Sequence, residues 1–206
     1  MLTEISMPQI MMRIIAMVVL MAVHGFSLAL LARAFGDRGP QYDGRLTLNP
    51  LNHLNVLGLV AGIAGRTGWI IPMDIAPKDV RDGRAGIVAI VVLSLLVLIG
   101  FGMLVLQARI LAASLLDPTI SNYVVMGMTT IADCAAWFAV FNLLPLPPLT
   151  GGLILAAFAP RAAAAIAKQS FWIGSAIVIL MVLTRGTWMQ PLVTPVRNLV
   201  FLGFGG

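Results

Sequence analysis

The chain is 206 residues long, and its composition is typical of a membrane protein rather than a soluble one. Hydrophobic residues make up 60% of it, charged residues only 10%, and the mean hydropathy is +0.99. A soluble domain is nearer half apolar and a quarter charged, so too little polar surface remains here to coat a water-soluble body. The net charge of +5 comes from 13 Lys and Arg residues scattered along the chain, which argues against a nucleic-acid-binding surface.

Apolar segments long enough to cross a bilayer follow one another along the chain, since a spanning helix needs about 20 mainly apolar residues. The candidate spans are 10–35, 53–71, 85–116, 125–144 and 170–184, with a partial or interfacial helix at 191–204 and a segment too short to cross at 151–159. We predict one all-α integral membrane domain over residues 1–206, with about four to six transmembrane helices. Positive charges divide about evenly between the two sides, so the positive-inside rule assigns no orientation.

Two stretches between the apolar segments have the pattern of extended chain. "GRLTLNP" (44–50) alternates with a period of two, and the prolines of "IIPMDIAP" (70–77) bias the preceding residues away from helix. Together they predict a short β-hairpin at the membrane rim, supported by the helices because an isolated hairpin is marginal in water. Its edge, which could receive an extended segment of a partner protein, consists of Arg45, Leu46, Thr47, Leu48 and Asn49.

Three segments give the chain a resemblance, over nearly its whole length, to the site-2 protease family of intramembrane zinc metalloproteases. They are "GDRGPQYDGRLTLNPLNHLNVLG" (36–58), "GWIIPMDI" (68–75) and "FNLLPLPPLTGGLIL" (141–155). The first and third are similar to the family's G-R-L-T-L-N-P-L-x-H and N-L-L-P-x-P-P-L-D-G-G patterns. The resemblance implies a site-2-protease-like core and a multi-pass protein of a bacterial inner (plasma) membrane.

The resemblance also identifies the positions of the family's zinc site, where an H-E-x-x-H helix and the aspartate of the L-D-G-G turn hold the metal. His24 matches the first histidine, but Gly25 occupies the glutamate position, Leu28 the second histidine position and Thr150 the aspartate position. One ligand of three remains, and the general base is missing. A catalytic zinc ion uses three protein ligands and a water molecule, so we expect no zinc cofactor and no catalytic residues.

Other polar residues leave alternatives open. A substitute site of His24, Asp133 and Cys134 would need two adjacent helix residues, about 100° apart, to face one metal. His24 is either a relic ligand or a buried histidine bonded to a neighbouring carbonyl or hydroxyl, and Thr150 is a reasonable helix N-cap. Asp133 and Asn142 form a candidate intramembrane polar site, or Asp133 pairs with an arginine or a backbone donor.

The sequence therefore predicts a catalytically inactive site-2-protease-like membrane protein that binds or scaffolds other integral membrane proteins within the lipid bilayer, in one form as an accessory subunit of a larger inner-membrane complex. The alternative is an active intramembrane zinc metalloprotease with non-standard ligands. A third possibility is a lipid- or pigment-binding helper, which no particular residue selects. The sequence names neither the partner nor the oligomeric state.

Overall fold

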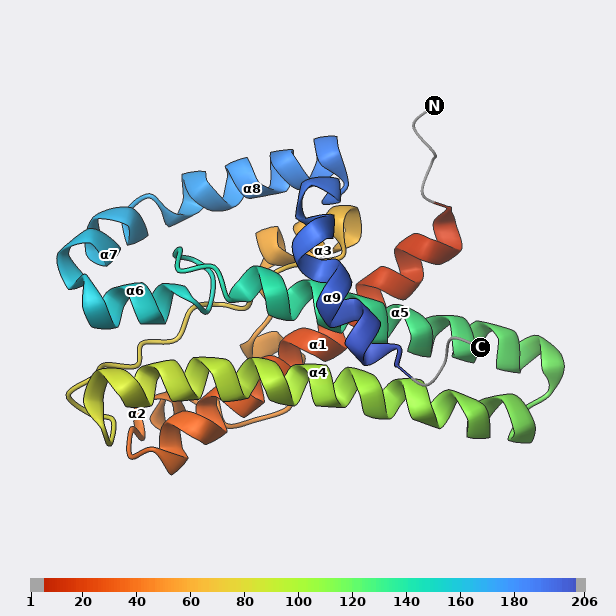
Figure 1. Ribbon diagram of the computed structural model, residues 1–206, viewed down its shortest axis with the longest axis horizontal. Helices are drawn as coiled ribbons and strands as arrows, with labels where there is room; N and C mark the ends of the chain where they lie inside the picture. Colours follow the sequence, from red (N-terminus) through yellow and green to blue (C-terminus); the bar gives the residue numbers. More distant parts are fainter. Residues whose placement is uncertain (1–5, 203–206) are drawn as a thin grey trace.

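The computed structural model describes residues 6–202, which form helices joined by short turns and two longer irregular segments (Figure 1). The helices are α1 (Met7–Ala34), α2 (Gly39–Tyr42), η1 (Pro50–Asn52), α3 (Val56–Gly65), α4 (Gly83–Leu115), α5 (Pro118–Asn142), α6 (Gly152–Phe158), α7 (Pro160–Ala167), α8 (Ser170–Thr184), η2 (Thr187–Met189) and α9 (Gln190–Val200). The long helices α1, α4 and α5 pack against one another, α3 packs against α8, and α9 crosses α5.

Of the described helices, α1, α4 and α5 are long and apolar enough to cross a membrane. A fourth span exists if α7 and α8, which meet at a bend of 71°, are taken together. By length and composition the described residues fit an all-α membrane protein with three spans, or four if α7 and α8 form one. Only the higher number reaches the four to six that the sequence predicts.

The predicted span at 53–71 is wrong, because only ten of its residues form a helix. Asn55 caps the start of α3 by accepting a hydrogen bond from the Gly58 N–H at 3.0 Å. At the other end Arg66 adopts a left-handed conformation with φ of 64°, which stops the helix. A helix of ten residues is roughly 15 Å long, about half the hydrocarbon thickness of a bilayer.

The structure does not show the predicted hairpin, since the described residues contain only one isolated antiparallel bridge, between Leu54 and Ile70. Side chains bend the segment 44–50 instead. The Asn49 N–H donates to Thr47 Oγ1 and the Leu51 N–H donates to Asn49 Oδ1, both at 3.1 Å. Such local bonds offer the backbone an alternative to a β ladder, so the alternating pattern of this segment does not become a strand.

Small residues bring α4 and α5 close together. A Cβ atom added at Gly102 would lie 2.9 Å from the Cβ of Ala135, whereas one added at Gly100, two residues earlier on the same helix, would meet nothing within 4 Å. The two glycines therefore face different surroundings, and only Gly102 is required for the approach of α5.

We expect Gly102→Leu to destabilise the protein by about 1–3 kcal/mol, because the added side chain has to force α4 and α5 apart. Gly100→Leu is the matched control and should leave stability unchanged or slightly raised, since it removes a helix-interior glycine without a collision. Unfolding in mixed detergent micelles measures both. Equal losses in the two variants would contradict this packing.

Candidate functional site

His24 lies in the middle of α1 and is completely buried. Its Nε2 atom is joined by a hydrogen bond of 2.8 Å to the hydroxyl of Thr150, a residue 126 positions later in the proline-rich turn. The ring meets Phe138 of α5 edge-on, with centroids 5.4 Å apart. We call the four positions that match the family's zinc site, His24, Gly25, Leu28 and Thr150, the family-site positions. Two of them are thus in direct contact, and the contact joins α1 to the turn between α5 and α6.

Asn142, the last residue of α5, holds this turn in place. Its Nδ2 donates to the carbonyls of Gly68 and Phe138 at 2.7 and 2.9 Å. Its Oδ1 accepts from both the backbone N–H and the hydroxyl of Thr150, each at 3.3 Å. The expectation that Thr150 caps a helix is therefore wrong: α6 begins at Gly152 with Gly151 as its N-cap, and the Thr150 hydroxyl is turned toward Asn142 and His24 instead.

The other two family-site positions are filled by apolar packing and by a second imidazole. Leu28, one turn after His24, is 1% exposed and belongs to the hydrophobic core. The ring of His53 lies directly against Gly25, so that even a Cβ atom at this position would collide with it. The space beside Gly25, where the family's glutamate side chain begins, is therefore taken by His53.

These side chains do not fit a catalytic zinc ion. The Nε2 atom of His24 is already bonded to Thr150, and the i+4 position offers leucine instead of a second imidazole. Among residues 6–202, no three His, Cys, Asp or Glu side chains gather closely enough to hold a metal. Glu4, the one glutamate of the sequence, lies outside the described residues.

The ring of His53 is buried and bonded on one side only. Its Nε2 contacts the carbonyl of Thr47 at 2.8 Å, and Nδ1 has no hydrogen-bond partner in the described part of the chain. Burial lowers the pKa of His53 below its ordinary value of 6.5, and the positive charge of Arg45 acts in the same direction, while the bond to Thr47 opposes both. The imidazole is therefore neutral at pH 7 and donates from Nε2.

A cavity of about 480 Å³ opens beside Leu28 and Thr150. Its wall includes the extended segment 70–74, the prolines of the turn and the small residues of α6 and α7, and Asp74 is the only acidic residue that lines it. Prolines 72, 147 and 148 line it. Proline-rich irregular backbone of this kind could have indicated the cavity from the sequence, because such backbone at membrane depth borders a cavity or is buried. The contributions of α6 and α7 carry no such signal.

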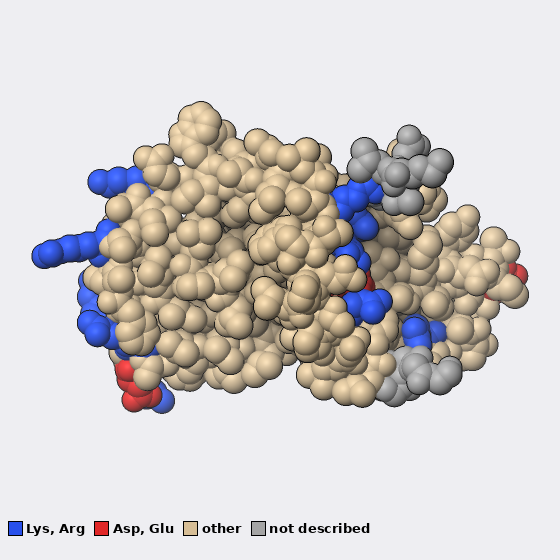
Figure 2. All heavy atoms as spheres, turned by 45° about the horizontal axis from the view of Figure 1, so that its top comes forward, with Lys and Arg blue, Asp and Glu red and all other residues tan. Residues whose placement is uncertain are grey.

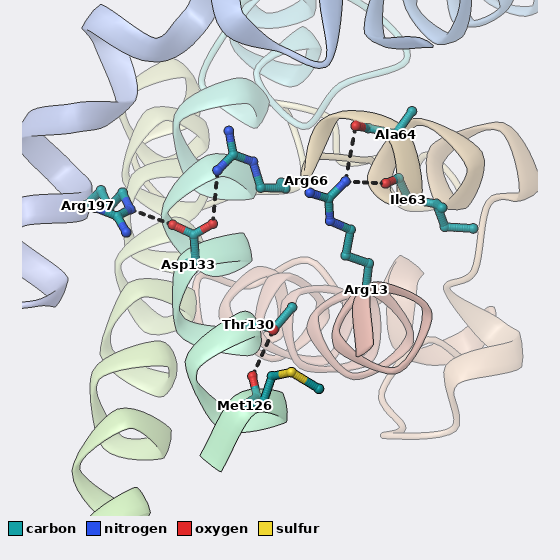
Figure 3. A network of polar contacts seen from close by, with 8 residues as sticks. All are labelled: Arg13, Ile63, Ala64, Arg66, Met126, Thr130, Asp133 and Arg197. Atoms are coloured by element: carbon teal, nitrogen blue, oxygen red, sulfur yellow. Dashed lines mark hydrogen bonds and ion pairs between the residues drawn. The ribbon is translucent and has the colours of Figure 1, made fainter. Parts of the chain in front are cut away.

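Asp133 lies in a different place, so Asp133 and Asn142 do not form one site. The two residues are nine positions apart on α5, roughly 13 Å along the helix. The carboxylate of Asp133 accepts from Arg66 at 3.4 Å and from Arg197 at 2.6 Å (Figure 3). The sequence did not identify these arginines as its partners, because they are 67 and 64 residues away along the chain and only the fold brings them together.

The comparison with curated proteins gives one relative over most of the chain. The chain is 29% identical over 182 residues to the protein named "Putative zinc metalloprotease YwhC" of Bacillus subtilis (strain 168), an alignment that covers 83% of this chain and 80% of that protein. No family model matches the chain, and no solved structure matches it. The similarity supports a site-2-protease-like relationship.

The buried ring of His53 gives a pH dependence with a definite sign. Below about pH 6.5 the unfolded chain binds a proton at His53 that the folded chain does not bind, so the free energy of unfolding should fall as the pH drops below that value. Denaturant unfolding at a series of pH values between about 5 and 8, the range in which histidine titrates, measures this change in the free energy of unfolding. His53→Gln should make the acid side of this profile shallower, since the buried His24 remains in the variant, and an unchanged slope would contradict the assignment.

Proposed function

We propose that the protein is a catalytically inactive site-2-protease-like membrane protein of the bacterial inner membrane, which binds other integral membrane proteins without cleaving them. The observation that carries the proposal is the hydrogen bond between His24 and Thr150. In a zinc site these two positions would both point at the metal, whereas here the Thr150 hydroxyl is bonded to Nε2 of His24. With Leu28 in the core and His53 against Gly25, the remaining two positions offer neither a ligand nor a base.

Binding does not require the lost chemistry, and two features beside the site support it. The cavity next to Leu28 and Thr150 is mainly apolar, as a pocket for a membrane segment would be. In the segment 45–49, the N–H groups of Leu46, Thr47 and Leu48 donate no hydrogen bond to any described residue, and the Leu48 side chain is 59% exposed. Unpaired donors of this kind can pair with an extended partner, although the segment is not itself in a sheet.

The same features suit an accessory subunit of a larger membrane complex. Many side chains on the outer surfaces of α4 and α8 are large, apolar and exposed, and they would meet either lipid or neighbouring helices. The partner class is therefore another integral membrane protein, and no cofactor is needed for its recognition.

The alternative is an active zinc metalloprotease with non-standard ligands, which the printed name of the Bacillus subtilis relative favours. Metal analysis of the purified protein separates the two proposals. We expect less than stoichiometric zinc and no cleavage of membrane-protein substrates by the natural sequence. The double variant Leu28→His, Thr150→Asp, which together with His24 supplies the family's three ligands, should bind zinc about one to one.

A positive result for zinc in the double variant shows that the scaffold and the assay can report a site. Stoichiometric zinc in the natural protein, together with loss of both zinc and proteolysis in His24→Ala, would overturn the inactive assignment and establish the alternative.

Binding through the segment 45–49 has a separate test. Leu46→Pro combined with Leu48→Pro removes two N–H donors, so co-purification of the membrane partner in mild detergent should be lost. The control Leu46→Ala, Leu48→Ala truncates the same side chains but keeps the donors, and should retain the partner. Equal recovery with all three proteins would count against main-chain pairing at this segment.

A further inference from the structure

A second recess lies away from the family-site positions and is lined by charged side chains. It has a volume of about 250 Å³ and is bordered by α1, the end of α3, the middle of α5 and α9. Arg13, Arg66 and Arg197 line it together with Asp133. Figure 2 shows basic side chains gathered around an acidic one in a hollow of this face, separated by uncharged surface from the charges at one end of the molecule.

The charges that line the recess do not balance. Asp133 provides one negative charge and accepts from Arg66 and Arg197, which reach it from two sides (Figure 3). Arg13 instead donates to the carbonyls of Ile63 and Ala64, at 2.6 and 3.3 Å, in the last turn of α3. Among residues 6–202, three guanidinium groups therefore face one carboxylate in this recess, an excess of two positive charges in the described lining.

The arginine side chains are held in position but keep capacity for a ligand. Arg66 lies over the ring of Trp137, with its guanidinium carbon 4.2 Å from the centroid, and Arg197 lies over Phe201 at 4.8 Å. Each uses a single N–H group toward Asp133, and the side chains of Arg66 and Arg197 are 30% and 45% exposed. A guanidinium has five N–H donors in a planar fork, which matches the oxygens of a phosphate group.

On α1, the recess lies at one end of a long uncharged stretch. On α1, Arg13 and Arg33 are 20 residues apart with no Asp, Glu, Lys or Arg between them, which is roughly 30 Å of helix. This is about the thickness of the hydrocarbon core, so when Arg33 lies at one surface, Arg13 lies at the other. Phosphate groups of lipids occupy that depth, and basic pockets between membrane helices are suited to anionic headgroups.

We propose that this recess binds a phosphate group that carries net negative charge, supplied by the headgroup of an anionic phospholipid. The phosphate oxygens would take N–H donors of Arg66 and Arg197 and compensate the excess charge beside Arg13. Met12, Met126 and Phe201, which also line the recess, provide apolar surface for the glycerol and acyl part of the lipid. The site is independent of the proposed partner binding, because none of its lining residues borders the cavity beside His24.

The test follows thermal unfolding of the full-length protein in an uncharged detergent while phosphatidylglycerol, phosphatidylcholine or inorganic phosphate is added. A ligand that binds the folded state raises the unfolding temperature by mass action. We expect phosphatidylglycerol to raise it and phosphatidylcholine, which has no net charge, to have little effect. Stabilisation by phosphatidylglycerol alone identifies the lipid as the source, and stabilisation by inorganic phosphate as well shows that the phosphate group suffices.

Three variants decide between a ligand site and a purely structural ion-pair cluster. Arg197→Gln should raise the concentration of phosphatidylglycerol needed for half of the effect about tenfold, whereas the control Arg161→Gln, on the exposed surface of α7, should not change it. Asp133→Asn removes the internal competitor, so this variant should start less stable and gain more from phosphatidylglycerol than the natural protein does.

If the charged residues only stabilise the fold, the expected result differs: Asp133→Asn should lose stability, and added phosphatidylglycerol should not restore it. The proposal is overturned if phosphatidylglycerol and phosphatidylcholine act equally on the natural protein. It is also overturned if Arg197→Gln and Arg161→Gln respond identically, or if neither phosphatidylglycerol nor inorganic phosphate has an effect.

Discussion

The contact between His24 and Thr150 is the interaction on which the site depends. Both groups are buried, where an unpaired polar atom is costly, and the contact removes that cost for Nε2 of His24 and for the Thr150 hydroxyl. Nδ1 of His24 has no hydrogen-bond partner among the described residues. Asn142 extends the contact by holding both the turn around Thr150 and the carbonyl of Gly68. One small network therefore joins α1, α5, the extended segment after α3 and the proline-rich turn.

The chain is similar to a protein named "Putative zinc metalloprotease YwhC", and its positions that match the family's site carry His24, Gly25, Leu28 and Thr150. The cavity beside Leu28 is lined by prolines of the turn, by the segment 70–74 and by small residues of α6 and α7. Of the four matching positions, Leu28 and Thr150 border it, with a leucine side chain and a hydroxyl. A cavity with this mainly apolar lining is suited to holding an apolar segment.

The charged groups follow a second constraint, which is the cost of charge in an apolar surrounding. Among the described residues, most of the charged ones lie on segments at one end of the molecule, and a separate group in a hollow of the surface surrounds an acidic side chain (Figure 2). This group consists of Arg13, Arg66 and Arg197 with Asp133. Pairing with Asp133 joins α5 to the end of α3 and to α9, so that three helices share one carboxylate. Because arginines outnumber that carboxylate, the same cluster stabilises the fold and is able to attract an anion.

The sequence by itself predicted the membrane class, the places of the long helices, although α5 begins at Pro118 and not at 125, and the four positions that match the family's site. Segment length and hydropathy decide the first two, and motif spacing decides the third. Only the tertiary structure decided that the segment 53–71 yields a short helix, that local side-chain bonds bend 44–50 away from a strand, and that His53 fills the space beside Gly25. The tertiary structure alone also decided that Arg66 and Arg197 are the partners of Asp133. The physical reason is that these contacts join residues tens of positions apart, whose meeting depends on helix packing and leaves no periodic pattern in the chain.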